Sequence, residues 1–228
     1  MKNVFFIFAP MKIQKKQIVL SILFILPLFA YMFFASGVNN FAKLDTVGEN
    51  VLTNDSYKSV FKDSLVTFQD KITILSFLGA DVDTKKAYAF NLKEKIYDRY
   101  KEFKDLQFVS VVLPGQATEV KSFMEALKYT SKADKWFFME LNNQQNQQLF
   151  KSLKTDLILD KFQSSSHVFI IDKNRNLRGR LEDEDGSKRY AYDMASVAEL
   201  SDEMNDDVKV ILAEYRLALK KYNKDENE

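Results

Sequence analysis

Hydrophobic and polar positions form two recurring patterns along most of the chain. Short, nearly continuous apolar runs that are rich in β-branched and aromatic residues predict buried strands. Such runs occupy residues 71–78, 106–113, 135–141 and 167–172, and a further short strand is expected over 177–183. The turn sequence KNRN joins the last two of these segments. Because this connection is short and polar, we expect those two strands to form an antiparallel hairpin.

Between these runs, apolar residues recur at intervals of three and four, which is the spacing of a helix packed on a sheet. This spacing is found over residues 84–103, from 118 onward, over 142–154 and in a long final stretch from 197 to 219. Strand, helix, strand and helix are therefore followed by a hairpin and a last helix. This order predicts a mixed α/β fold, a thioredoxin-like sandwich with a central mixed sheet flanked by helices.

A different pattern comes before the domain. Residues 18–36 carry no charge, and at about 1.5 Å per residue a helix of this length spans the hydrocarbon core of a bilayer. The first cation after this run is Lys43, whereas lysines precede it at positions 12, 15 and 16. The positive-inside rule then predicts a single-pass anchor in the plasma (inner) membrane, with a cytoplasmic N-terminus and a periplasmic or extracytoplasmic domain.

Two alternatives at the N-terminus stay open. The small residues Ala35 to Gly37 resemble a signal-peptide cleavage site, although the apolar run exceeds the roughly 7 to 15 residues of a signal sequence. We therefore favour a retained anchor. Residues 1–10 add a second, shorter apolar piece, so that Met11 is an alternative start.

These patterns divide the chain into five parts. They are a cytoplasmic N-terminus (1–17), a transmembrane anchor (18–36), a polar tether that leads into the domain (37–64), the thioredoxin-like domain (65–222) and a charged tail (223–228). No internal repeat or low-complexity tract is visible.

The amino-acid composition excludes several classes of partner and of functional site. A hydrophobic content of 46% over 228 residues is enough for a substantial core. Lys and Arg number 33 against 32 Asp and Glu, for a net charge of +1, so we do not expect nucleic acid as a partner. There is no cysteine, which excludes disulfides, thiolate metal sites and thiol oxidoreductase chemistry. We expect no cofactor.

Four segments resemble, in order, motifs of the Sco/SenC family, membrane-anchored proteins of thioredoxin fold that deliver copper to cytochrome c oxidase. SFLGADVDTKKAYAFNL resembles the strand-to-helix turn F-x-x-C-x-x-x-C-P, and FVSVVLPGQATEVKSFMEAL resembles the S-x-x-x-D-P-x-x-D strand and helix. KWFFMEL is similar to the Trp-containing segment, and SSSHVFIIDKNRNLRGRLED resembles the hairpin that contains Arg-Gly. The resemblance covers roughly residues 65–220.

This resemblance implies a degenerate member of the family. Ala80 and Thr84 stand at the two cysteine positions of the turn, and Ser164 stands at the position of the copper-binding histidine. Soft thiolate ligands select Cu(I), and no residue of this chain supplies them. The Met residues are scattered, which is typical of packing positions and not of a chelating cluster.

Asp81, Asp83 and His167 form the alternative candidate site. Two carboxylates and an imidazole can bind zinc or iron. Carboxylates at a helix N-terminus are, however, also favoured by capping and by the helix dipole, and we prefer this interpretation for both aspartates. The acidic sequence LEDEDGSKRYAYD lacks the ligand spacing of a calcium loop and is interpreted as an exposed hairpin tip.

Taken together, the residues and the resemblance favour a membrane-anchored protein that is not an enzyme. Its expected partner is a protein, bound during assembly or maintenance of a respiratory oxidase or another envelope complex. One alternative is a permanent accessory subunit of a membrane complex. The other is a metal carrier or enzyme that uses Asp81, Asp83 and His167.

Overall fold

The computed structural model describes residues 15–36, 43–51, 57–60, 65–130, 132–183 and 186–225. The chain forms two compact units, residues 1–41 and 42–228. Helix α1 (Lys15–Ser36) belongs to the first unit and contains Pro27. Among the described residues, no helix combines the length and the apolar character needed to cross a membrane.

Some N-terminal predictions fall partly or wholly outside the described residues. The anchor expected at 18–36 falls within α1, where the side chains of residues 18 and 34–36 are not described. The alternative start at Met11 and part of the tether also lie outside the described residues.

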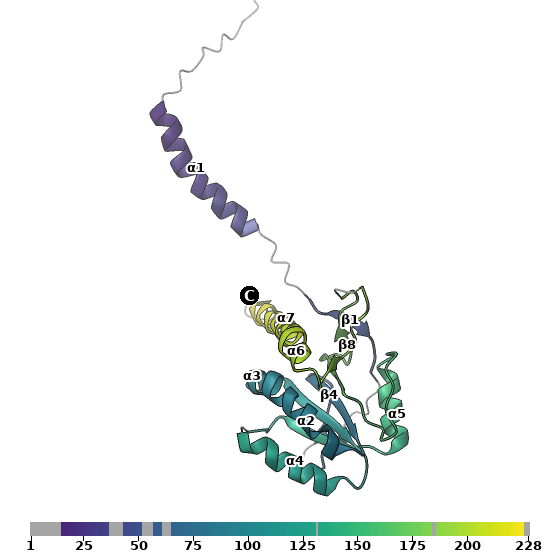
Figure 1. The fold of residues 1–228 in the computed structure, drawn as a ribbon. Coiled ribbons are helices and arrows are strands. Elements are labelled where there is room, and N and C mark those ends of the chain that lie inside the picture. Colours follow the sequence, from purple (N-terminus) through teal and green to yellow (C-terminus); the bar gives the residue numbers. More distant parts are fainter. Residues whose placement is uncertain are drawn as a thin grey trace, which may run out of the picture. The chain divides into compact units, whose positions relative to one another are not determined.

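A seven-stranded mixed sheet forms the centre of the second unit (Figure 1). Strands β4, β5 and β6 are parallel to one another, whereas β7, β8 and β1 continue the sheet antiparallel beyond β4, and β9 pairs with β7. The strands are β1 (Asp45–Gly48), β4 (Ile72–Gly79), β5 (Leu106–Val112), β6 (Trp136–Glu140), β7 (His167–Ile171), β8 (Leu177–Gly179) and β9 (Tyr192–Asp193). The predicted β7–β8 hairpin is confirmed.

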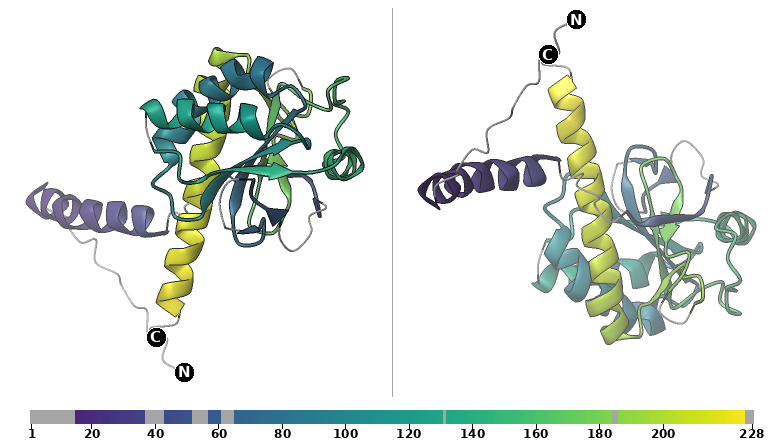
Figure 2. Two further views of the ribbon diagram at one scale, coloured as in Figure 1. Left: turned by 90° about the horizontal axis from the view of Figure 1, so that it is seen from below. Right: turned by 90° about the horizontal axis from the view of Figure 1, so that it is seen from above.

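Helices cover both faces of this sheet. Helices α2, α4 and α7, together with the π-helical turns η1 and η2, pack on one face, and α5 packs on the other. The C-terminal part of α7 extends beyond the sheet (Figure 2). The helices are α2 (Val82–Leu92), η1 (Lys93–Tyr97), α3 (Asp98–Tyr100), α4 (Ala117–Thr130), α5 (Asn143–Ser152), α6 (Val197–Glu199), η2 (Leu200–Met204) and α7 (Asn205–Asp225).

The sheet divides the hydrophobic core into two layers because side chains alternate between its faces. Along β4, Ile72 and Ile74 belong to the layer that contains α2, α4 and α7, whereas Leu75 and Phe77 belong to the layer that contains α5. Since both faces are covered, the central strands are mostly apolar, with a few buried polar residues such as Ser76 and Ser110. This explains why continuous apolar runs predicted them correctly.

The tether contributes strands that the apolar patterns did not predict. Strand β1 lies within the predicted tether and pairs with β8 at the edge of the sheet. A separate small sheet joins β2 (Tyr57–Lys58) to β3 (Leu65–Val66). Elements of two to four residues are too short to show a recognisable period.

The acidic sequence after β8 is not simply an exposed tip, and that prediction is wrong for Asp183. The Asp183 side chain is only 7% exposed and lies between Arg180, at 3.1 Å, and Arg189. Residues 180 and 189 face each other in an antiparallel bridge, which brings both arginines to this carboxylate. Residues 184 and 185 lie outside the described part of the chain.

Candidate functional site

The strand-to-helix turn lies where β4 ends and α2 begins. Gly79 has φ +58°, in the left-handed region that favours glycine. A Cβ atom at Gly79 would lie 2.3 Å from the carbonyl oxygen of Phe162. The Ala80 amide donates a hydrogen bond to that same oxygen (2.9 Å), and the Leu113 amide donates to the Gly79 carbonyl (3.0 Å). The backbone of this turn is therefore fixed by two segments that are distant in sequence.

Two of the three degenerate positions, Ala80 and Ser164, lie in segments that contact each other at this turn. The Ser165 amide donates to the Phe77 carbonyl (2.8 Å), so the segment that contains Ser164 runs beside the end of β4. Ser164 is fully buried, whereas Ala80 and Thr84 are exposed. Thus the structure places Ser164 in the segment that hydrogen bonds to the turn carrying Ala80.

Asp160 organises the segment opposite the turn. Its carboxylate accepts hydrogen bonds from the Phe162 and Ser164 amides (both 2.9 Å) and from the Ser164 hydroxyl (2.7 Å). Lys85, on α2, lies 3.6 Å from the same carboxylate. Burial alone would raise the pKa of Asp160, but these hydrogen bonds and the Lys85 charge outweigh it and lower the pKa. A carboxylate with these partners has a structural role.

The carboxylates of α2 behave differently from each other. Asp83 lies in the first helical turn, where the helix dipole favours a negative charge, and pairs with Lys86 at 2.5 Å. Asp81 is the N-cap residue of α2, but its side chain makes no capping hydrogen bond. The predicted side-chain capping is therefore wrong for Asp81.

His167 begins β7 and lines a different cavity. Its backbone amide donates to the Ser165 hydroxyl (3.1 Å), and its Nδ1 lies 3.5 Å from the same oxygen. The cavity beside His167 measures about 220 Å³ and is also lined by Asp183, Arg189 and Glu199. Asp81, Asp83 and His167 do not form a metal site, since no group of three His, Cys, Asp or Glu residues in the described part of the chain is arranged to hold an ion.

An apolar surface that the sequence reasoning missed lies next to the turn. We call residues 157–163 the turn-side segment. Within it, Ile158 is 84% exposed and Phe162 is 42% exposed, and the segment borders a groove of about 340 Å³ that reaches Phe150 on α5. The Asn146 amide group donates to the Gln163 carbonyl (2.9 Å), which holds the segment to α5. The sequence LILDKF carries this signal, because its apolar residues belong to no predicted element.

Comparisons with known proteins support the fold. No family model and no curated protein matches the chain. Among solved structures, BsSco, a member of the Sco family of cytochrome c oxidase assembly proteins, is 12% identical with a TM-score of 0.53, and the match covers 75% of this chain and 98% of that chain. The chain has a thioredoxin-like fold. At this identity the similarity establishes the fold alone.

Other solved structures align over a similar range with lower scores. A thiol:disulfide interchange protein of the thioredoxin family from Chlorobium tepidum TLS is 16% identical, with a TM-score of 0.46 over 75% of this chain and 99% of that chain. A proposed electron transfer protein from Aquifex aeolicus VF5 is 12% identical, with a TM-score of 0.49 over 72% and 97%.

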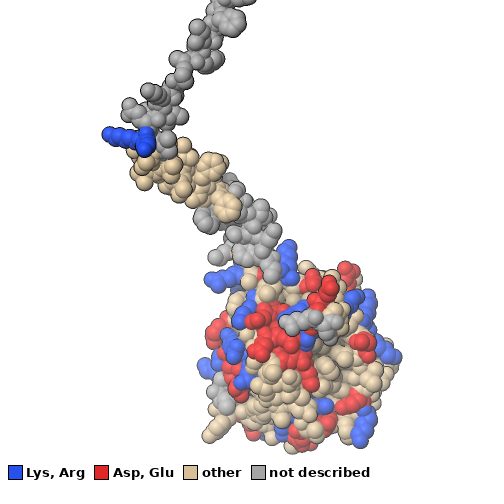
Figure 3. All heavy atoms as spheres, turned by 45° about the horizontal axis from the view of Figure 1, so that its top comes forward, with Lys and Arg blue, Asp and Glu red and all other residues tan. Residues whose placement is uncertain are grey.

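Charge is distributed unevenly over the folded unit. Acidic side chains gather on the face shown in Figure 3, with basic side chains among them and around its outline. Among the described residues, several charged side chains form ion pairs, such as Arg180 with Asp207 (2.9 Å) and Arg189 with Glu199 (2.9 Å). Because each of these charges has an oppositely charged partner, we interpret the pairs as structural.

Proposed function

We propose that this chain is a membrane-anchored, non-catalytic protein with a degenerate Sco-like site, which binds a protein partner. The binding serves assembly or maintenance of a respiratory oxidase or another envelope complex. The observation that carries this proposal is the strand-to-helix turn, which keeps its backbone architecture without any side chain suited to redox or soft-metal chemistry.

The chemistry of the three degenerate positions supports a non-catalytic role. Ala80 has no donor atom, and Thr84 and Ser164 carry only hydroxyls. The Ser164 hydroxyl is already engaged by Asp160. In the folded unit the Met side chains belong to the core, since Met139, Met194 and Met204 are fully buried and the partly buried Met124 packs against it. Copper transfer by soft ligands has no support among these residues.

The turn-side segment supports protein binding. A large apolar side chain exposed next to a groove is typical of an interaction surface. Ile158 and Phe162 lie within one such segment, and the hydrogen bonds to Asp160 hold its backbone in place. A surface that is already ordered loses less conformational entropy on binding.

The sequence supports the membrane anchor. Residues 18–36 are uncharged and follow a lysine-rich start, and the whole of this stretch lies within helix α1. In the proposed topology, the N-terminus is cytoplasmic and the folded unit is extracytoplasmic.

Site-specific photo-crosslinking of the full-length chain in its native membranes tests this function. A photoreactive phenylalanine analogue replaces Ile158 in one variant and Tyr129 in a matched control. Tyr129 is 94% exposed on α4, so both positions are accessible, but Tyr129 lies outside the turn-side segment. We expect one defined membrane-protein adduct from position 158 and none of that mass from position 129.

The result also separates a transient factor from a permanent subunit. A transient factor gives an adduct with a minor fraction of the chain, and it leaves the complex on detergent purification. A permanent subunit stays with the complex at a constant ratio. Equal adducts from both positions, or none from position 158, would overturn binding through the turn-side segment.

A further inference from the structure

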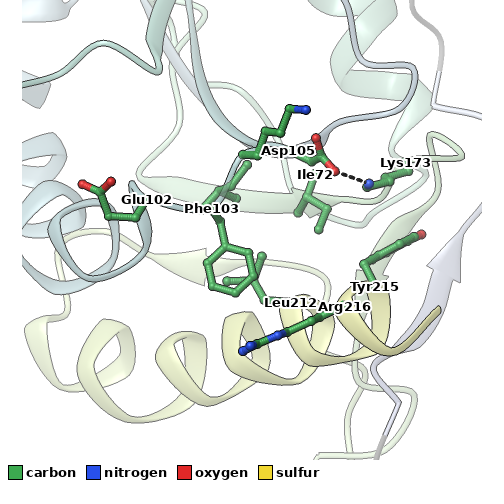
Figure 4. A pocket seen from close by; sticks show the side chains of 10 residues that line it. Ile72, Glu102, Phe103, Asp105, Lys173, Leu212, Tyr215 and Arg216 are labelled. Carbon is green, nitrogen blue, oxygen red and sulfur yellow. Dashed lines mark hydrogen bonds and ion pairs between the residues drawn. The ribbon is translucent and has the colours of Figure 1, made fainter. Parts of the chain in front are cut away.

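A separate cavity lies at the opposite end of β4 from the strand-to-helix turn. It measures about 360 Å³ and is lined by Ile72 and Leu106, which begin β4 and β5, by the loop before β5 and by α7 (Figure 4). Ile72 and Gly79 are seven positions apart along β4, which corresponds to roughly 23 Å. The volume falls within the range of about 300 to 1,000 Å³ that is usual for small-molecule sites. This cavity is therefore independent of the proposed partner surface.

Apolar side chains form the floor of the cavity. Ile72, Leu106 and Leu212 are buried, and Phe103 and Tyr215 pack against the same core layer. In Figure 4 the Phe103 ring lies next to Leu212. Filling this space with an apolar body is favourable because about 25 cal/mol is gained for each Å² of apolar surface removed from water.

The charges around the cavity favour an anion. Asp105 is already engaged, because Lys173 donates to it at 2.6 Å and Lys71 lies 3.8 Å away. Lys104 and Arg216 also line the cavity, and the side chain of neither forms a hydrogen bond or ion pair with another described residue. The hydrogen bond from Lys173 and, more weakly, the charge of Lys104 nevertheless lower the pKa of Asp105. The remaining carboxylate of the lining, Glu102, points away from Leu212 and Tyr215 in Figure 4. The Arg216 guanidinium is thus left to face a ligand, and Lys104 adds a positive charge to the lining.

We propose that this cavity binds an amphipathic monocarboxylate, whose apolar chain packs on Phe103 and Leu212 and whose carboxylate pairs with Arg216. A guanidinium group binds a carboxylate through two parallel hydrogen bonds, which gives this contact both strength and orientation. Lys104 supplies the second positive charge. The bound molecule joins α7 to the loop before β5.

Photolabelling of the full-length chain in nanodiscs tests the proposal. The probe is decanoate that carries a diazirine in its chain, and labelled peptides are identified by mass spectrometry. We expect labels on peptides that contain residues 102–106 and 212–216, with competition by excess decanoate and little competition by decanol. Arg216→Gln should reduce this labelling at least fivefold, whereas Lys128→Gln, which removes an exposed cation of α4, should leave it unchanged.

Three results would overturn the proposal. They are equal labelling of wild type and Arg216→Gln, equal competition by decanol and decanoate, or labels spread over other peptides. A diazirine-bearing phosphatidylglycerol serves as the comparison probe. If this probe labels the same peptides preferentially, the cavity binds a membrane lipid and the proposed monocarboxylate ligand is wrong. If the cavity does not bind the probe, the proposal that the turn-side segment binds a protein is not affected, because the two sites lie at opposite ends of β4.

Discussion

Arg178 is the arginine of the hairpin motif, and it has a structural role. Its guanidinium is buried and pairs with Asp172 at 3.1 Å and with Glu214 at 2.7 Å. The Asp172 carboxylate also accepts hydrogen bonds from the Asn174 and Asn176 amides, which shape the turn between β7 and β8. This part of the family resemblance therefore reflects folding and carries no information about metal chemistry.

Replacement of Arg178 should be costly. Arg178→Met leaves two carboxylates without their shared cation, and we expect the free energy of unfolding to fall by about 3 kcal/mol. Urea unfolding followed by the fluorescence of Trp136, the single and buried tryptophan, measures this change. Lys128→Met is the control and should shift stability by less than about 0.5 kcal/mol. A loss under about 1 kcal/mol for Arg178→Met would contradict the structural role.

Asp160 should make stability depend on pH in the acid range. Its pKa is lowered in the folded state, so it stabilises the fold above the unfolded value of about 3.9, and this contribution is lost as pH falls through the folded pKa. Asp160→Asn should therefore weaken the loss of stability below about pH 4. At pH 7 it should cost about 1 kcal/mol at most, since the carboxylate is partly exposed.

Urea unfolding at several pH values checks this prediction. Glu125→Gln removes an exposed carboxylate on α4 and is the matched control. If Asp160→Asn and wild type lose stability in parallel between pH 5 and pH 2, the carboxylate does not hold the turn-side segment as described.

The strands and helices differ in how well the sequence predicts them. Strands β4 to β7 are buried on both faces, so their apolar runs give an unambiguous signal, and the hairpin follows from its polar turn. The helix predicted over 84–103 is interrupted by η1, and the final helix is interrupted by η2. In both helices the spacing of apolar residues continues through the π-helical turn, so the sequence pattern does not reveal the turn. Strands β1 and β9 depend on tertiary pairing with β8 and β7 and have no local signal of their own.

The junction of β4 and α2 offers a direct test of close contact at the turn. Gly79→Ala combines a positive φ with a Cβ atom 2.3 Å from the Phe162 carbonyl oxygen, and we expect a loss of about 3 kcal/mol in unfolding free energy. Gly115 also has a positive φ (+90°), but nothing lies within 4 Å of its Cβ position. Gly115→Ala should therefore cost only about 1 kcal/mol, from backbone strain alone.

Thermal and urea unfolding of the two variants separate these contributions. The difference between them isolates the contact between the turn and residues 162–163. If both variants lose the same unfolding free energy, the turn-side segment moves away from the new Cβ atom without loss of stability, and it is not fixed against β4.

The folded unit brings together residues that the sequence alone could connect only through a family resemblance. Ala80 and Ser164 are more than eighty positions apart, yet their segments exchange backbone hydrogen bonds. The resemblance anticipated this proximity. It could not anticipate the exposed apolar side chains of the turn-side segment, because exposure depends on which surfaces the other elements cover. The alternative ligands failed for a similar reason, since His167 lies in a cavity with Asp183 and Glu199.

Competition for Cu(I) tests most directly whether the turn has lost its chemistry. The purified full-length chain is titrated with Cu(I) in the presence of bicinchoninate, a coloured chelator, with His167→Ala as the comparison variant. We predict that wild type and variant both leave the copper with the chelator, because no cysteine is present and no soft ligands converge on the turn. Retention of one equivalent of Cu(I) per chain against the chelator would contradict the account.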